Sequence, residues 1–148
     1  ENLSPDEMDV ILNKQSGLLG VSGISSDMRE LEDAMTCGNK RAELAHKMFI
    51  YRIKKTIGSY AAVLNGLDVL VFTAGIGENN DYVREMICQD MDFLGIKLDA
   101  KKNHGINHLF EIGDSKAHVK IVVVPTDEEM AIAKETESLV LATKGKQL

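Results

Sequence analysis

The sequence predicts an α/β fold with parallel strands and flanking helices. Two mainly β-branched runs, at residues 68–73 and 119–125, are typical of buried strands. Apolar residues recur every three or four positions through residues 39–66, which predicts a long helix packed on a sheet. Since a further helical stretch separates the two strand runs, the order favours a parallel crossover.

The first element is predicted to be a helix that begins after Ser4. Ser4 serves as the N-cap, Pro5 takes the first helical position and Glu7 completes a capping box. The helix should run to about Lys14. Its buried side should carry Met8, Ile11 and Leu12.

Residues 13–29 are predicted to form an irregular segment. Gly17, Gly20 and Gly23 fall within seven residues, a density that disfavours a regular element. Ser26 is the expected N-cap of the helix that follows. The long helix over residues 39–66 should then begin at Asn39 and end at Gly66. Its expected apolar stripe comprises Leu44, Ala45, Met48, Phe49, Ile53, Ile57, Tyr60, Ala61 and Leu64.

The strand over residues 68–73 is expected to be central and covered on both faces. It runs into a turn with Gly75 and Gly77, which can reach positive φ and let a ligand approach the backbone. A helix over residues 81–94 should follow and end at Gly95. Its inward residues should be Val83, Met86, Ile87, Met91 and Leu94. Such a junction of strand, glycine turn and helix is suited to phosphate or ribose oxygens, although any βα turn tolerates glycine.

The remaining elements are two short strands near residues 96–98 and 109–112, the strand over residues 119–125 and a final helix over residues 127–142. The tail after residue 142 should be frayed. His104 and His108 are four residues apart, but Gly105 between them favours a loop over a metal-binding helix.

Composition excludes several classes of protein. A net charge of −6 and an aromatic content of 5% argue against a nucleic-acid surface. No apolar run is long enough to span a membrane and no signal segment opens the chain, so we expect a cytoplasmic protein. Cys37 and Cys88 are expected to be buried, reduced thiols. Because the chain starts at Glu1 with no preceding strand, we expect the carboxyl-terminal portion of a longer protein.

Three segments of the chain are specific: NKQSGLLGVSGISSDMRE from residue 13, TAGIGEN from residue 73 followed by Val83 and Arg84, and VVVPTDEEMAIA from residue 122. They resemble segments of acetate kinases, members of the acetate and sugar kinase, Hsp70 and actin superfamily. Their order and intervals are similar to those of the family, over essentially the whole chain. The resemblance implies an RNase H-like (actin-like ATPase) fold. Residues 1–148 would be an incomplete carboxyl-terminal nucleotide-binding domain, whose final helix, from about residue 127, contacts a missing amino-terminal domain.

The resemblance also implies a nucleotide site and its residues. An arginine can lie on a purine face while an aspartate accepts a hydrogen bond from a hydroxyl or amino group. Without the resemblance, Asp27 would be interpreted as a carboxylate that compensates the helix dipole and Arg29 as a solvated cation. The implied nucleotide-binding residues are Asp27, Met28, Arg29, Gly75, Ile76, Gly77, Glu78 and Asn79.

The acidic string after Pro125 is implied to contribute a magnesium ligand. If Thr126 is the N-cap, Glu129 closes a T-x-x-E capping box and leaves Glu128 free to face a ligand. The family pattern likewise associates this first glutamate with Mg²⁺. The alternative for Glu128 is compensation of the helix dipole.

The implied activity is the transfer of a phosphoryl group from ATP to acetate, giving acetyl phosphate and ADP, in a homodimer. The family's catalytic residues have no counterpart in this chain, which should be inactive alone. Propionate and butyrate kinases share these motifs, so both remain alternatives. A non-catalytic nucleotide-binding module related to actin or Hsp70 is a further alternative. A dinucleotide-binding dehydrogenase is disfavoured, because Asn80 stands where G-x-G-x-x-G needs its third glycine.

Overall fold

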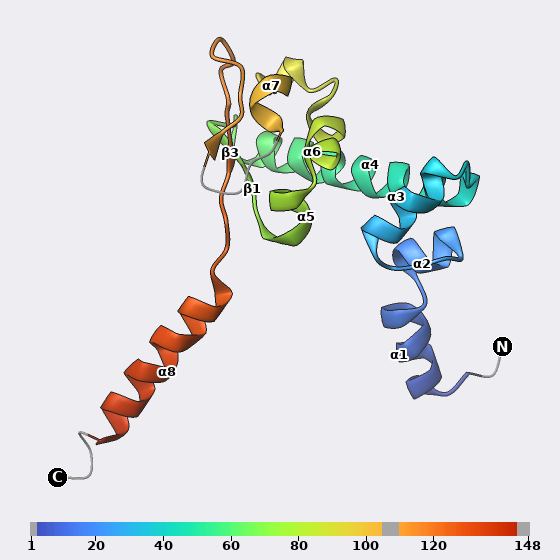
Figure 1. Ribbon diagram of the computed structural model, residues 1–148, viewed down its shortest axis with the longest axis vertical. Coiled ribbons are helices and arrows are strands. Elements are labelled where there is room, and N and C mark those ends of the chain that lie inside the picture. Colours follow the sequence, from blue (N-terminus) through green and yellow to red (C-terminus); the bar gives the residue numbers. More distant parts are fainter. Residues whose placement is uncertain (1–2, 105–109, 145–148) are drawn as a thin grey trace.

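The fold is described from a computed structural model, which covers residues 3–104 and 110–144, without the side chains of residues 142–144. Its elements in order are α1 (Pro5–Lys14), α2 (Gly17–Ser22), α3 (Met28–Thr36), α4 (Lys40–Val63), β1 (Val69–Phe72), α5 (Ala74–Asn79), α6 (Asp81–Cys88), η1 (Asp92–Leu94), α7 (Ala100–Asn103), β2 (Phe110–Glu111), β3 (Lys120–Val123) and α8 (Glu128–Lys144). The sheet and the helices α3–α7 lie together, and α8 extends away from them (Figure 1).

The sheet has three strands in the order β1-β3-β2. β1 and β3 are parallel, with Val69 opposite Lys120, and β2 is antiparallel to β3, with Phe110 opposite Val123. The parallel pair of an α/β fold is therefore confirmed. The central position predicted for β1 is wrong, because within the described chain β1 pairs with β3 alone. The prediction that β1 is covered on both faces is also wrong, because Val71 on one face is 50% exposed while Phe72 on the other is 7% exposed.

The main core lies between the sheet and helices α4 and α6. Its buried residues are Ile50, Phe72, Val83, Ile87, Cys88, Met91, Ile96, Ile112, Val119, Ile121 and Val123. The long helix begins after Asn39, whose side chain accepts hydrogen bonds from the Arg41 and Ala42 N–H groups, as predicted. Gly66, at φ 138°, follows the end of the helix, and its N–H donates to the Ala61 carbonyl. Only part of the predicted stripe of α4 is covered: Phe49, Ile53 and Ile57 pack on the core, whereas Tyr60 is 64% exposed.

A smaller core joins α2 and α3 to the amino-terminal half of α4. Leu31, Ala42 and Ala45 are buried there, and Leu18 and Val21 of α2 pack against them. The prediction of an irregular segment before residue 29 is thus wrong in part. Two of the glycines form the ends of α2 instead of preventing the helix: Gly17, at φ 60°, is its first residue, and Gly23, at φ 69°, is its C-cap. Gly20 lets the turn close, since a Cβ there would lie 2.9 Å from the Gln15 carbonyl oxygen.

Two predicted boundaries differ after β1. The helix that begins at Asp81 ends at Cys88 instead of Leu94, because Gln89 leaves the helical conformation at ψ 137°. Asp90 then takes φ 57° and the chain continues into η1. Residues 96–98 contribute only an isolated bridge, between Leu98 and Gly113. The predicted positions 105–109, which include His108, lie outside the described residues.

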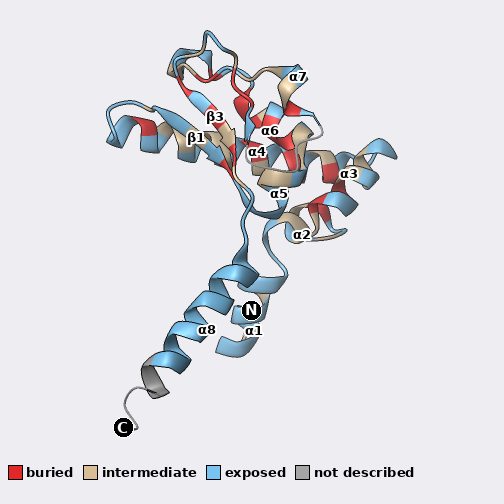
Figure 2. Cartoon of the chain, turned by 60° about the vertical axis from the view of Figure 1, so that its left-hand side comes forward, coloured by how far each residue is buried: buried red, intermediate tan, exposed pale blue. Residues whose placement is uncertain are grey.

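The two terminal helices contribute little to either core. The Ser4–Glu7 capping box of α1 is present as predicted. The buried side predicted for α1 is absent, since Met8 is 43% exposed and Leu12 is 59% exposed. Every residue of α8 from 128 to 141 is exposed (Figure 2). No helix within the described ranges is long and apolar enough to cross a membrane.

The two cysteines have different surroundings. Cys88 is a buried thiol, and burial raises its pKa to about 12. Cys37 is exposed at the end of α3, so the expectation of two buried thiols is wrong for this residue.

Candidate functional site

A cavity of about 760 Å³ lies between the start of α3 and the α5–α6 junction. Its lining is Ser26, Asp27, Met28, Arg29, Glu32, Gly75, Ile76, Asn79, Asn80, Asp81 and Tyr82. The two contributing segments are far apart in sequence and meet because α4 and β1 return the chain to the same place. Six of the eight residues predicted to bind nucleotide line this cavity, and Gly77 and Glu78 do not.

The first side of the cavity is built on the N-terminus of α3. Asp27, and not the predicted Ser26, is the N-cap, and its carboxylate accepts from the Arg29 N–H at 2.9 Å. The same carboxylate binds the Arg29 guanidinium, at 2.7 Å from Nη2 and 3.2 Å from Nε. These hydrogen bonds lower the pKa of Asp27 to about 2. The pair therefore presents an oriented guanidinium plane and an ionised carboxylate at neutral pH.

The second side is α5, which begins directly after β1. The positive φ expected of Gly75 and Gly77 is found at Ala74 instead, at φ 59°, while both glycines lie inside the helix. A Cβ on Gly75 would meet nothing within 4 Å, whereas one on Gly77 would lie 3.3 Å from the Phe72 carbonyl carbon. Gly75 thus keeps the cavity open, and Gly77 lets α5 pack against β1.

Sequence reasoning missed Glu32 and Asn80, which join the two sides. The Asn80 amide donates to Glu32 Oε1 at 2.7 Å, and its oxygen accepts from the Val83 N–H as the N-cap of α6. Glu32 stands one helical turn beyond Met28, a spacing that places both on one face of α3. This spacing from Met28 was the feature of the sequence that could have placed Glu32 in the site.

Behind Glu32 lies His46 of α4, which is 2% exposed. Its Nε2 is 3.6 Å from Glu32 Oε1 and has no hydrogen-bond partner among the described residues. The imidazole stacks on Tyr82, with ring centroids 5.4 Å apart. Burial lowers the pKa of His46, and the nearby Glu32 carboxylate opposes that shift.

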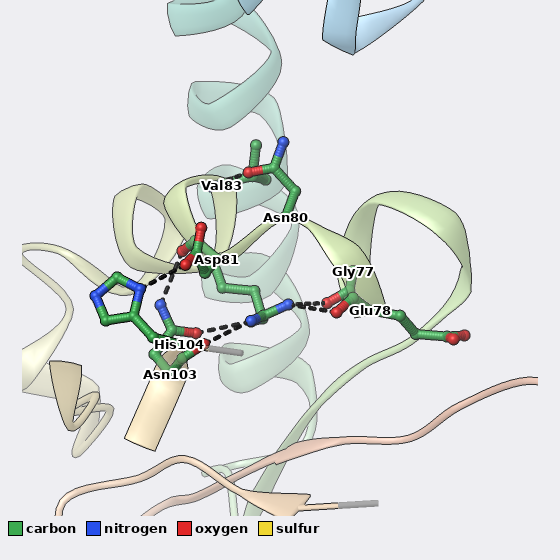
Figure 3. Close-up of polar contacts among 8 residues, drawn as sticks. Gly77, Glu78, Asn80, Asp81, Val83, Asn103 and His104 are labelled. Carbon is green, nitrogen blue, oxygen red and sulfur yellow. Dashed lines mark hydrogen bonds and ion pairs between the residues drawn. The ribbon is translucent and has the colours of Figure 1, made fainter. Parts of the chain in front are cut away.

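The buried side chain of Arg84 holds the end of α5 from inside the molecule. Its Nη1 donates to the Gly77 and Glu78 carbonyls at 2.9 and 2.8 Å. Its Nε and Nη2 bind the side-chain and main-chain oxygens of Asn103 (Figure 3). Asn103 in turn donates to the Asp81 carbonyl at 2.8 Å. The family-like Val83-Arg84 pair is therefore structural: Val83 is in the core and Arg84 anchors the helix that lines the cavity.

The acidic string after Pro125 is arranged differently from the prediction. Asp127 caps α8, since its carboxylate accepts from the Met130 N–H at 2.9 Å. Thr126 instead donates, through its N–H and its hydroxyl, to Glu78 Oε1, both at 2.8 Å. The predicted Thr126–Glu129 capping box is therefore wrong. Glu128 is exposed at the first residue of α8 and does not line the cavity.

A second cavity, of 590 Å³, lies beside α4 and α6 and includes His46, Ile50 and Met86 in its wall. Its four lysines already have partners: Lys40 and Lys47 bind Glu43 at 3.0 and 2.7 Å, Lys54 donates to the Gln89 carbonyl, and Lys55 Nζ lies 5.4 Å from the centre of the Tyr51 ring. None of the residues predicted to bind nucleotide lies in its wall.

The three-stranded mixed sheet, its covering helices and a cavity beside the carboxyl end of β1 are those of an α/β protein. The match to solved structures places it in the acetate and sugar kinase/actin-like class. The chain belongs to the acetokinase family, whose model matches residues 1–134. The fold class expected from the sequence is thereby confirmed.

Relatives and solved structures agree with this assignment. The chain is 54% identical over 142 residues to an acetate kinase of Moorella thermoacetica, covering 96% of this chain and 36% of that protein. A crystal structure of Porphyromonas gingivalis acetate kinase matches with a TM-score of 0.85 and 50% identity, covering 93% of this chain and 35% of the other. A propionate kinase from Francisella tularensis matches with a TM-score of 0.79 and 41% identity, covering 90% and 34%. The chain thus spans about a third of the length of these proteins.

Proposed function

We propose that this chain supplies the adenosine side of the active site of a phosphotransferase that converts acetate and ATP to acetyl phosphate and ADP. The observation that carries the proposal is the 760 Å³ cavity, which brings Asp27 and Arg29 together with Gly75 and Asn79. A volume of that order suits a nucleoside-sized ligand. The names of the relatives supply the acyl substrate and the reaction.

Each side of the cavity has a role in this proposal. The Arg29 guanidinium, oriented by Asp27, offers a flat cationic surface for a purine. Gly75 leaves open space for the ligand beside the α5 backbone. Asn79 donates from its amide to the Gly75 carbonyl at 2.9 Å, which fixes the wall at this point. The chain's own contribution to catalysis is therefore to bind and orient the nucleotide.

The magnesium ion expected for this reaction would draw one ligand from this chain. Among the described residues no group of three His, Cys, Asp or Glu side chains could hold a metal by itself. Mg²⁺ is commonly held by one or two carboxylates together with substrate phosphates, and it neutralises charge on the transferring oxygens. Glu128, exposed at the first residue of α8, fits the role of such a single carboxylate.

The nucleotide site is tested by calorimetric titration of the chain with ATP, ADP and NAD. We expect binding of ATP and ADP, a loss of at least tenfold in affinity for Arg29→Ala, and little change for Arg52→Ala, which removes an exposed arginine of α4 outside the cavity wall. Glu128→Ala should reduce only the part of the affinity that depends on Mg²⁺. A preference for NAD, or equal effects of the two arginine variants, would exclude this site.

The reaction is tested in a chimera in which this chain replaces the matching segment of the Moorella thermoacetica acetate kinase. Trapping with hydroxylamine should detect acetyl phosphate made by the chimera and none made by the chain alone. A chimera that folds and binds ATP without forming acyl phosphate would favour a non-catalytic module related to actin or Hsp70.

Propionate is the second candidate substrate, because one of the matching structures is a propionate kinase. Assays of the natural full-length protein with acetate, propionate and butyrate decide between them. For the same protein we propose a homodimer, and we propose that α8 packs against a domain outside this chain.

A further inference from the structure

Glu78 was expected among the nucleotide ligands, but its carboxylate lies elsewhere. It is absent from the wall of the cavity, and Oε1 accepts two hydrogen bonds from Thr126, from the N–H and the hydroxyl, each at 2.8 Å. Figure 3 shows the Glu78 side chain directed away from Asn103, and the Glu78 main-chain carbonyl accepts from Arg84 Nη1 at 2.8 Å. The Glu78 carboxylate thus links α5 to the segment before α8, through a partner residue that is 48 positions away in the sequence.

That link joins the two parts of the proposed site. On one side is α5, whose Gly75, Ile76 and Asn79 line the nucleotide cavity. On the other is the short segment between β3 and α8, with Glu128 two residues beyond Thr126. Hydrogen bonds to a carboxylate are shorter and stronger than those between neutral groups, so this contact is suited to fixing one element against the other.

Two further hydrogen bonds support the same junction. The Thr73 hydroxyl donates to the Val124 carbonyl at 2.8 Å, and the Val124 N–H donates to the Phe72 carbonyl at 2.8 Å. They continue the β1–β3 pairing past the ends of both strands. Past the ends of the two strands, the hydrogen bonds between Glu78 and Thr126 connect α5 to the segment that leads into α8. Ionised Glu78 is the form that accepts both bonds, and they lower its pKa.

We propose that Glu78 is a positioning residue that couples the nucleotide-binding helix α5 to the strand–helix junction carrying Thr126 and Glu128, so that nucleotide bound in the cavity orders the start of α8. The inference rests on the function proposed above. It gives this glutamate a role through Thr126 instead of direct contact with the ligand.

The test combines ATP affinity with hydrogen exchange on the 148-residue chain. We expect Glu78→Ala to weaken ATP binding about fivefold and to abolish the ATP-induced protection of the Thr126 and Met130 amides. Thr126→Val, which removes the hydroxyl, should show a smaller loss, and Thr126→Ser should behave as the unaltered chain. The double variant of Glu78→Ala and Thr126→Val should bind like Glu78→Ala alone, because one contact is lost in both.

Glu85→Ala is the matched control, since it removes the same charge from an exposed position of α6 and should change neither reading. Additive losses in the double variant, with ATP-induced protection of the Met130 amide retained in Glu78→Ala, would identify Glu78 as a direct ligand and overturn the inference. Unchanged affinity and protection in Glu78→Ala would also overturn it while leaving the nucleotide site intact. Absence of ATP binding by the unaltered chain would instead overturn the proposed function, and the inference with it.

Discussion

At the scale of single residues, the two glycines of the TAGIGEN segment have separate tasks. Gly75 faces open space in the cavity, and Gly77 lies against the backbone of Phe72. We expect Gly77→Val to destabilise the fold by about 1–3 kcal/mol, because the added atoms overpack the contact between α5 and β1. Gly75→Leu should leave the melting temperature nearly unchanged and should reduce ATP affinity by about tenfold.

Thermal unfolding and calorimetric titration of the two variants separate these effects. A stable Gly77→Val protein, or a Gly75→Leu protein with full affinity for ATP, would show that α5 is placed differently from the structure described above.

His46 makes stability depend on pH. Its pKa is lowered by burial in the folded chain, while in the unfolded chain it titrates near the ordinary value of 6.5. Unfolding therefore takes up a proton below that pH, so this contribution to stability is complete above about pH 7 and is lost as the pH falls through 6.5. We expect the urea midpoint to fall between pH 7 and pH 5, and His46→Phe to flatten that dependence.

The exposed His118 provides the comparison, since His118→Gln should leave the pH dependence of the urea midpoint as it is. An identical slope in His46→Phe and the unaltered chain would assign the effect to other groups.

At the scale of elements, the start of α8 depends on Asp127 and not on Glu129. The Asp127 carboxylate accepts from the Met130 N–H at 2.9 Å, which satisfies one of the unpaired donors of the first turn. We expect Asp127→Ala to cost about 0.5–2 kcal/mol of local stability, visible as faster exchange of the Met130 amide. Glu129→Ala is the control and should leave that exchange unchanged. Faster exchange in Glu129→Ala alone would restore the capping box expected from the sequence.

At the scale of the whole molecule, α8 carries apolar side chains that neither core covers. Ile132 is 65% and Leu141 62% exposed, and the helix extends away from the sheet (Figure 1). Large exposed apolar surfaces favour association. We therefore expect this chain to self-associate, through α8 or through a surface used in the proposed homodimer.

Sedimentation equilibrium measures this directly, and replacing Ile132 and Leu141 by lysine should shift the population towards monomer if α8 is the contact. A monomer at concentrations up to about one millimolar would contradict the expectation.

The sequence alone determined the class of fold, the parallel strand pair, the limits of α1 and the limits of α4. Those features follow from local causes: β-branched runs, the capping side chains of Ser4 and Asn39, and the glycine after α4. Local rules failed where a residue's partner is distant in sequence. The carboxylate of Glu78 is held by Thr126 and the amide of Asn80 by Glu32, both 48 residues away.

Only the tertiary structure could divide the predicted nucleotide residues into those that line the cavity and those that hold its wall. Asp27 and Arg29 were found from their motif, whereas Glu32 entered the site because α3 packs beside the α5–α6 junction. The edge position of β1 among the described residues was likewise decided by which strands pair, since an apolar run has the same pattern at the centre of a sheet and at its edge.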